Sequence, residues 1–163
     1  MIEDTGLGEQ APAPLWPFAL EIYARPGVAA LCLEAQDRAG ADVPLLLWGA
    51  WAAAGGRVLT DADVNAARAL ADQWRGPVIT PLRQARRALK NLAGGEALRQ
   101  TVKAAELEAE RLYLAALEAL SAGWPAPPGP CPVPWATALR DNLARLLPPD
   151  AGPVTERLHK ALS

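Results

Sequence analysis

The sequence predicts an all-α fold: a bundle of six core helices with a long helical hairpin and a proline-rich C-terminal arm that carries two short helices. Three observations predict it. Apolar residues recur at steps of three and four, glycine and proline interrupt this pattern repeatedly, and no segment of useful length alternates as a strand would. With 163 residues, of which 51% are hydrophobic, the chain can bury a core without disulfides or metals.

The first three helices are expected at about 15–24, 26–38 and 43–54. Arg25-Pro26-Gly27 separates the first from the second, and Gly40 stops the second. Asp42 is the expected N-cap of the third helix, with Pro44 in its first turn. Because the third helix is apolar on every side, we expect it to lie at the centre of the fold.

The next three helices are expected at about 60–74, 80–91 and 96–121. Thr60 and the acids that follow it are typical of a capped helix start. Gly76-Pro77 is expected to end the fourth helix, and Thr80-Pro81 to open the fifth with a capping residue before a first-turn proline.

The sixth helix is the longest, and apolar or small residues recur along it at alternating steps of four and three. They are Leu98, Val102, Ala105, Ala109, Leu112, Ala116 and Ala119. This is the a/d pattern of a packing seam, and its small residues allow a neighbouring helix to come close. A homodimer through this seam is one reading. Because Gly94-Gly95 joins the fifth and sixth helices, we expect them to form an antiparallel hairpin.

We expect three parts along the chain: a disordered leader over 1–14, a helical core domain over 15–121, and a proline-rich connector with a short helical arm over 122–163. The connector, GWPAPPGPCPVP, contains too much proline to be helical throughout. The two short helices of the arm are expected at about 135–147 and 154–162.

Histidine and cysteine usage excludes most metal and nucleophilic chemistry. His159 is the only histidine, so the usual zinc sites and helical di-iron sites lack ligands. Neither Cys32 nor Cys131 has a basic neighbour in sequence that would activate its thiol, and no phosphate-loop or dinucleotide motif occurs. We expect no cofactor and no metal. An enzyme is disfavoured, although one that works through carboxylates, Arg, Lys or Tyr stays open.

The apolar runs are too short for a membrane span. The longest covers residues 43–54, against the roughly 20 residues that a spanning helix needs. The first 14 residues show no basic and apolar pattern of a secretory signal. A cytoplasmic protein is therefore expected.

Residues 75–103 form a basic segment, with seven lysines and arginines against one glutamate, in a chain whose net charge is −2. Four of these bases share one face of the fifth helix: Arg83, Arg86, Arg87 and Lys90. This face could dock an acidic or phosphate-bearing partner. Alternatively, it is a solvated face that is partly paired with Glu106 and Glu110 across the hairpin. Nucleic acid is disfavoured, because the pI is about 5.4 and the face holds no aromatic residue for stacking.

A second candidate site lies around the loop between the second and third helices. Gln36, Asp37 and Asp42 gather polar groups there, and Trp48 supplies an apolar wall just beyond. Such a mixture could line a pocket for a small ligand or for metal-independent catalysis. The alternative is that Asp37 and Asp42 cap helix ends.

Three groups of residues resemble one known family. They are Leu15-Trp16-x-Phe18-Ala19-Leu20, Gln36-Asp37-x-x-Gly40-x-Asp42-Val43, and Lys103-Ala104-Ala105-Glu106-Leu107-Glu108-Ala109-Glu110. The family consists of short proteobacterial proteins and is a domain of unknown function, DUF2390; the resemblance covers about residues 15–120. It implies a bacterial, helical, intracellular protein and no particular activity. Pro44 departs from the family pattern, in which asparagine is expected, so a polar role at that position would be lost here.

Overall fold

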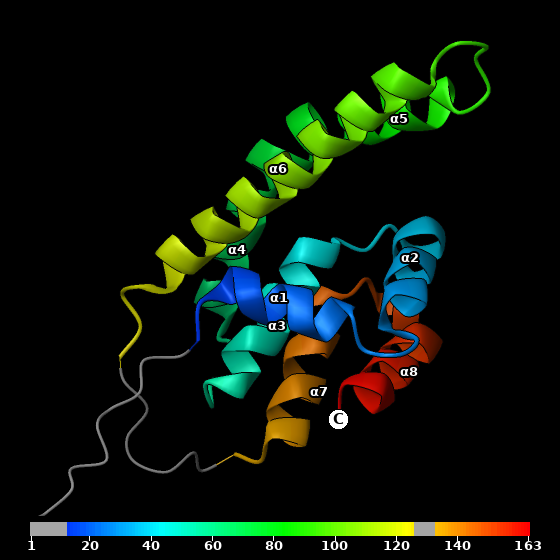
Figure 1. The fold of residues 1–163 in the computed structure, drawn as a ribbon. Helices are drawn as coiled ribbons and strands as arrows, with labels where there is room; N and C mark the ends of the chain where they lie inside the picture. The colour runs from blue at the N-terminus through cyan, green and yellow to red at the C-terminus, as the bar shows by residue number, and fades with distance from the viewer. Residues whose placement is uncertain (1–12, 126–132) are drawn as a thin grey trace, which may run out of the picture.

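The computed structural model describes residues 13–125 and 133–163, and within these ranges it contains helices and no strand. The prediction of an all-α fold is confirmed (Figure 1). The elements are α1 (Leu15–Tyr23), α2 (Val28–Ala39), α3 (Val43–Ala54), α4 (Asp61–Trp74), a π-helical turn (Arg75–Ile79), α5 (Thr80–Leu89), α6 (Glu96–Ser121), α7 (Trp135–Leu146), a 3-10 turn (Pro149–Ala151) and α8 (Gly152–Leu162). The predicted leader up to residue 12 and the middle of the predicted connector, 126–132, lie outside the described residues.

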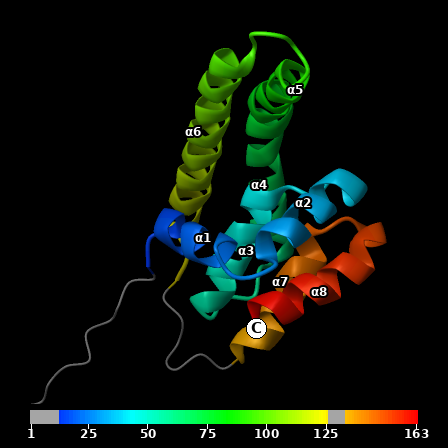
Figure 2. The ribbon, with the colours of Figure 1, turned by 45° about the vertical axis from the view of Figure 1, so that its right-hand side comes forward.

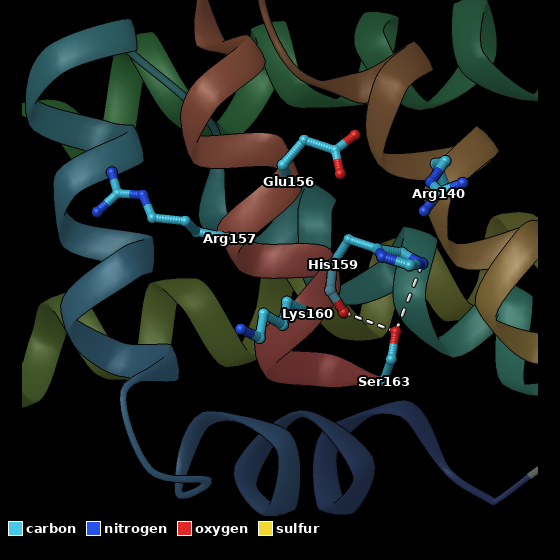
Figure 3. A pocket seen from close by; sticks show the side chains of 6 residues that line it. All are labelled: Arg140, Glu156, Arg157, His159, Lys160 and Ser163. Atoms are coloured by element: carbon cyan, nitrogen blue, oxygen red, sulfur yellow. Dashed lines mark hydrogen bonds between the residues drawn. The ribbon is translucent and has the colours of Figure 1, made fainter.

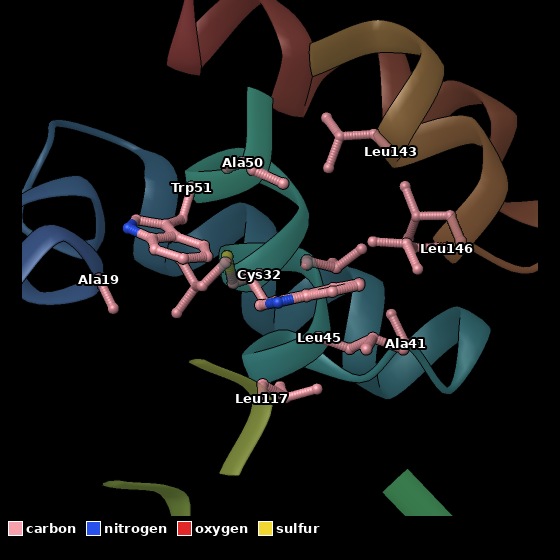
Figure 4. Packing of buried hydrophobic residues seen from close by; sticks show 14 of the residues in the cluster. Ala19, Cys32, Ala41, Leu45, Ala50, Trp51, Leu117, Leu143 and Leu146 are labelled. Carbon is pink, nitrogen blue, oxygen red and sulfur yellow. The ribbon is translucent and has the colours of Figure 1, made fainter. Parts of the chain in front are cut away.

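α3 lies at the centre of the fold, as its all-round apolar sequence predicts. Its N-terminus is capped by Asp42, whose Oδ1 accepts a hydrogen bond from the Leu45 amide at 3.2 Å. Its sides pack against α1, α6 and α7. Figure 4 shows Trp51 and Ala50 of α3 between Ala19 of α1 and the leucines of α7. Burial of this one helix therefore joins three others into a single core.

α7 comes close to α3 at Gly49. A Cβ atom at this position would overlap Cδ1 of Leu146, so the glycine makes the close approach possible. At the same crossing the buried Asn142 side chain donates to the carbonyls of Gly49 and Arg57, at 3.0 and 2.9 Å, and accepts from the Leu59 amide at 2.8 Å. The first helix of the predicted arm is therefore part of the hydrophobic core, which the sequence reasoning did not foresee.

α4 begins with the predicted cap, but it does not end where predicted. Thr60 and Asp63 form a reciprocal capping box. Gly76-Pro77 was expected to break the helix; instead the chain passes through a π-helical turn directly into α5. The Thr80 amide bonds to the Arg75 carbonyl, five residues back. This wider turn accommodates a proline, which lacks an amide hydrogen and would clash in a regular turn. Thr80 therefore lies inside a continuous helix, and its predicted role as a cap is wrong.

α5 and α6 form the predicted antiparallel hairpin, and it projects from the body of the molecule (Figures 1 and 2). The predicted seam of α6 is only partly right. Ala109 is buried, whereas Leu98, Ala105, Leu112 and Ala119 are exposed. The buried residues of α6 are Glu106, Ala109, Tyr113, Leu114, Leu117 and Ser121. The packed side of α6 is thus rotated away from the apolar stripe, because two charged or polar residues, Glu106 and Tyr113, find partners inside.

α8 completes the fold by packing on α2 and α7. Arg157 of α8 pairs with Glu34 of α2, and Arg25 donates to the Leu162 carbonyl at 2.9 Å. No helix in the described part of the chain is long and apolar enough to cross a bilayer.

Candidate functional site

The two predicted sites meet at one charged cluster, where the hairpin leaves the body. Arg83 of α5 donates to Glu106 of α6 at 3.2 Å and to Glu110, one turn further along α6, at 3.0 Å. Arg86 also pairs with both oxygens of Glu106. The Glu106 side chain is only 9% exposed, so these pairs are screened less by solvent than ordinary surface pairs.

The local structure explains why these residues meet. In the antiparallel hairpin, the first turns of α5 lie beside the middle of α6, which places Arg83 level with Glu106. No residue of α5 is fully buried, and its half-buried positions include Leu82, Arg83, Arg86 and Leu89. The inner side of α5 is therefore partly basic and partly apolar. The alternative reading from the sequence, a basic face paired with Glu106 and Glu110, describes Arg83 and Arg86.

Arg87 and Lys90 behave differently from the two arginines before them. Arg87 pairs with Asp37 of α2 at 2.8 Å, and both side chains are 54% exposed. Lys90 is exposed and makes no ion pair with any described residue. Asp37, which the sequence placed in a separate pocket, thus lies against a residue of the predicted basic face. The pKa of Asp37 is held below its usual value by its hydrogen bond from Arg87.

Asp42 has a structural role that occupies both of its oxygens. Oδ1 caps α3, and Oδ2 accepts a hydrogen bond from the Tyr113 hydroxyl of α6 at 3.0 Å. Burial raises the pKa of Asp42, although the Leu45 amide, the Tyr113 hydroxyl and the charges of Arg75 and Arg83 act in the opposite direction. The capping alternative is therefore what the structure shows for Asp42.

Glu106 and Glu110 have pKa values shifted in opposite directions. Burial raises the pKa of Glu110, and the negative charges of Glu106 and Asp42 add to this, against the effect of Arg83. For Glu106, burial is outweighed by the hydrogen bonds and charges of Arg86 and Arg83, so its pKa is lowered. Carboxylates whose surroundings separate their pKa values are typical of acid–base sites, although structural ion-pair networks give the same signature.

The remaining residues of the predicted pocket do not come together around an opening. Trp48 is completely buried, and its indole N–H donates to the Ser121 hydroxyl at 2.8 Å. Gln36 is half-buried and is next to the exposed Asp37 in the chain. Two shallow hollows in the described surface lie elsewhere. Their lining residues are Arg140, Glu156, Arg157, His159, Lys160 and Ser163 for one (Figure 3), and Asp61, Val64, Asn65, Arg68 and Arg145 for the other.

The described residues also show how potential metal ligands, His159 and Cys32 are placed. No group of three or more potential ligands gathers there that could hold a metal ion. His159 lies with Nε2 2.7 Å from the Ala136 carbonyl, which the ring can satisfy by donating to it. Burial raises the pKa of the Cys32 thiol to about 11, so this cysteine is not an activated thiolate.

Two residues of the cluster were missed by the sequence reasoning. Arg75, in the π-helical turn, donates to the Gly40 carbonyl at the end of α2. Tyr113 is stacked on Trp74 of α4, with ring centroids 6.3 Å apart, while its hydroxyl reaches Asp42. The signal for Tyr113 was available: it is the one aromatic residue of α6, seven residues after Glu106 and therefore on the same side of the helix.

The comparisons with known proteins agree with the resemblance seen in the sequence. A family model described as a protein of unknown function, DUF2390, matches residues 14–117. No curated protein and no solved structure matches the chain.

Proposed function

Since the chain belongs to the DUF2390 family, which is described as a protein of unknown function, we propose from its geometry that it is a non-enzymatic adaptor or regulatory protein. In this proposal it docks an acidic or phosphate-bearing partner through the basic side of the α5–α6 hairpin. A cytoplasmic location, expected from the sequence, is part of the proposal.

The observation that carries this proposal is that the hairpin projects from the body and that basic residues of its outer part make no ion pair among the described residues. The hairpin stands away from the body in both views (Figures 1 and 2), and no residue of α5 is buried. Lys90 and Lys103 are exposed, and neither makes an ion pair within the described part of the chain. Leu92, between them along the chain, is 60% exposed. We call Lys90, Leu92 and Lys103 the tip surface.

The ion pairs show which of the predicted basic residues are held by the fold and which are available to a partner. Arg83 and Arg86 are held by Glu106, and removing them for a partner would leave that buried carboxylate without its counter-charges. Arg87 is more available, because its exposed pair with Asp37 is the kind that contributes little to stability. The proposal therefore assigns docking to Arg87 and the tip surface, and a structural role to Arg83 and Arg86.

An acidic partner fits this surface better than nucleic acid does. Exposed lysines attract carboxylates and phosphates through long-range charge, while the chain as a whole is acidic, with a net charge of −2. Within the tip surface the apolar contribution comes from a leucine, which suits a protein surface and offers no ring for base stacking.

The test is affinity capture from the source cell with the wild type and with the Lys90→Glu/Lys103→Glu variant, at low salt and at about 0.5 M salt, where exposed charge contacts are largely screened. The proposal expects at least one partner that the wild type retains at low salt and that either the variant or high salt releases. A partner set that is identical in all conditions contradicts it.

A matched control separates the tip surface from charge in general. Arg140→Glu/Lys160→Glu makes the same change in net charge on α7 and α8, far from the hairpin (Figure 1). This control is expected to retain every partner that the wild type retains. Loss of the same partners from both variants would mean that total charge matters, and not the hairpin.

A second candidate function, a small-ligand-binding protein or metal-independent enzyme, is supported by one observation. Asp42 and Glu110, both with raised pKa values, lie in one cluster with Arg83. A thermal-shift screen of small metabolites on the wild type and on Glu110→Gln tests it. A compound that stabilises the wild type and not the variant supports this candidate, whereas equal shifts for both proteins, or no shift, count against it.

A further inference from the structure

The outer side of α6 carries an apolar stripe that no described element covers. Its residues are Leu98, Ala105, Leu112 and Ala119, which follow one another at intervals of seven and are all exposed. Leu98 is 57% exposed and Leu112 is 42% exposed, both high values for leucine on a helix that also contributes to the core. Figure 2 shows α6 at the edge of the molecule, with α5 along one side only. The stripe is distinct from the tip surface.

The order of side chains along the stripe points to its occupant. Leucine and alanine alternate, so the stripe presents large, small, large, small. A second α6 running antiparallel, with the two-fold axis between residues 108 and 109, sets Leu98 opposite Ala119 of the second copy and Ala105 opposite Leu112. Every layer then combines one large and one small side chain, which is how facing positions fill space without gaps. A parallel pair in register would place leucine on leucine and alanine on alanine.

Charge at the middle of the stripe agrees with the antiparallel arrangement. Glu108 and Arg111 form an exposed ion pair at 2.6 Å beside the proposed axis. Across that axis, Glu108 lies about two residues, or roughly 3 Å along the helix, from Arg111 of the second copy. Four charges of alternating sign would then meet at the centre, while a parallel pair would set Glu108 against Glu108. Antiparallel helix dipoles also attract one another.

We propose that the chain forms a homodimer through the Leu98–Ala105–Leu112–Ala119 side of α6, with the two helices antiparallel and related by a two-fold axis between residues 108 and 109. In such a dimer the two hairpin tips point in opposite directions, so the molecule presents two tip surfaces. The dimer does not depend on the proposed adaptor function.

A size-swap experiment tests both the dimer and its register. Sedimentation equilibrium of the wild type over a range up to about 100 µM is expected to show a monomer–dimer equilibrium. Leu112→Ala leaves alanine facing alanine in two layers, and Ala105→Leu forces leucine against leucine. Each single variant is expected to raise the dissociation constant at least about tenfold. The Ala105→Leu/Leu112→Ala double variant restores one large and one small side chain per layer, so it is expected to regain most of the wild-type affinity.

Leu107→Ala is the matched control, because Leu107 is 54% exposed and lies about 140° around the helix from Leu112. It is expected to leave the dissociation constant unchanged. A wild type that is monomeric throughout the range overturns the proposal. A wild-type dimer that Leu112→Ala weakens but the double variant does not rescue, with circular dichroism showing normal folding, overturns the register.

Discussion

The Arg83 guanidinium of α5 donates through Nε to Glu106 of α6 at 3.2 Å, and this pair joins the two helices of the hairpin where they meet the body of the protein. The same arginine also donates to Glu110. The negative charge of Asp42, at the start of α3, in turn raises the pKa of Glu110. Two sites that look independent in the sequence, with Asp42 and Arg83 41 positions apart, are therefore neighbours in one network. The network explains how a strongly basic segment can belong to a folded and slightly acidic protein.

Replacing Glu106 with glutamine is expected to lower the free energy of unfolding by about 2 kcal/mol, because Arg83 and Arg86 lose their charged partner in a half-buried position. Urea denaturation measures this. Glu108→Gln is the control, measured like Glu106→Gln on protein dilute enough to be monomeric. Among the described residues Glu108 pairs with Arg111 alone, on the exposed side of the same helix, and its loss is expected to change the stability of the monomer by less than about 0.5 kcal/mol. Equal losses in the two variants would mean that the Glu106 ion pairs stabilise the fold no more than an exposed pair does.

The effect of Glu106→Gln is expected to depend on pH. The folded pKa of Glu106 lies below its unfolded value of 4.5, so the folded state binds this proton less tightly than the unfolded state. The stabilisation is therefore complete above about pH 4.5 and is lost as the pH falls through the folded pKa. Unfolding curves of wild type and variant should be far apart at pH 7 and converge in acid. A difference that stays constant down to acid pH contradicts the ion-pair explanation.

Tyr113→Phe removes the hydroxyl that donates to Asp42 and leaves a buried carboxylate with one fewer partner. We expect a loss of about 1.5 kcal/mol in unfolding free energy and a further rise in the pKa of Asp42, because the hydroxyl favours the ionised form. Carbon-detected NMR titration of the Asp42 carboxyl measures the second effect. An unchanged pKa would show that the hydroxyl does not interact with Asp42 in solution.

Asn142→Ala is expected to destabilise the protein by about 3 kcal/mol. The substitution leaves the Leu59 amide and the carbonyls of Gly49 and Arg57 without their partner at a completely buried position. Thermal unfolding followed by circular dichroism checks this against Asn65→Ala, which alters an exposed asparagine of α4. The Asn65 variant should be as stable as the wild type. Similar melting temperatures for both variants would contradict the role given to Asn142.

Gly49→Ala should cost about 1–2 kcal/mol, because its new methyl group meets Leu146 of α7. Leu146→Ala alone creates a cavity, but in the double variant the two changes compensate, so the double variant should be more stable than the sum of the single changes predicts. Gly76→Ala, at a glycine with open space around it, is the control and should not destabilise. Strict additivity of the two changes would show that α3 and α7 do not meet at this point.

Features set by neighbouring residues could be predicted from the sequence. The Thr60 and Asp42 caps, the Gly40 stop and the hairpin at Gly94-Gly95 all depend on short stretches, and the structure has each of them. The pairing of Arg83 with Glu106 was also foreseeable as an alternative, since the length of the hairpin fixes which residues are level.

Features set by distant parts of the chain could not be predicted in this way. The π-helical turn keeps α4 and α5 continuous despite Pro77, a result of tertiary packing overriding a local breaker. Glu106 occupies a buried position of α6 because two arginines on another helix satisfy it, so a pattern of apolar residues alone gives the wrong side. The packing of α7 on α3 depends on Gly49 and Asn142, 93 residues apart.

The central claim is that the basic segment is divided between two arginines that hold the fold, Arg83 and Arg86, and more exposed bases that can dock a partner, among them Lys90 and Lys103. Denaturant unfolding of two matched double variants tests it most directly. Arg83→Gln/Arg86→Gln and Lys90→Gln/Lys103→Gln remove the same number of charges. We predict that the first loses about 2–4 kcal/mol of unfolding free energy and that the second changes by less than about 0.5 kcal/mol. Equal losses, or a larger loss for the lysine variant, would contradict the claim.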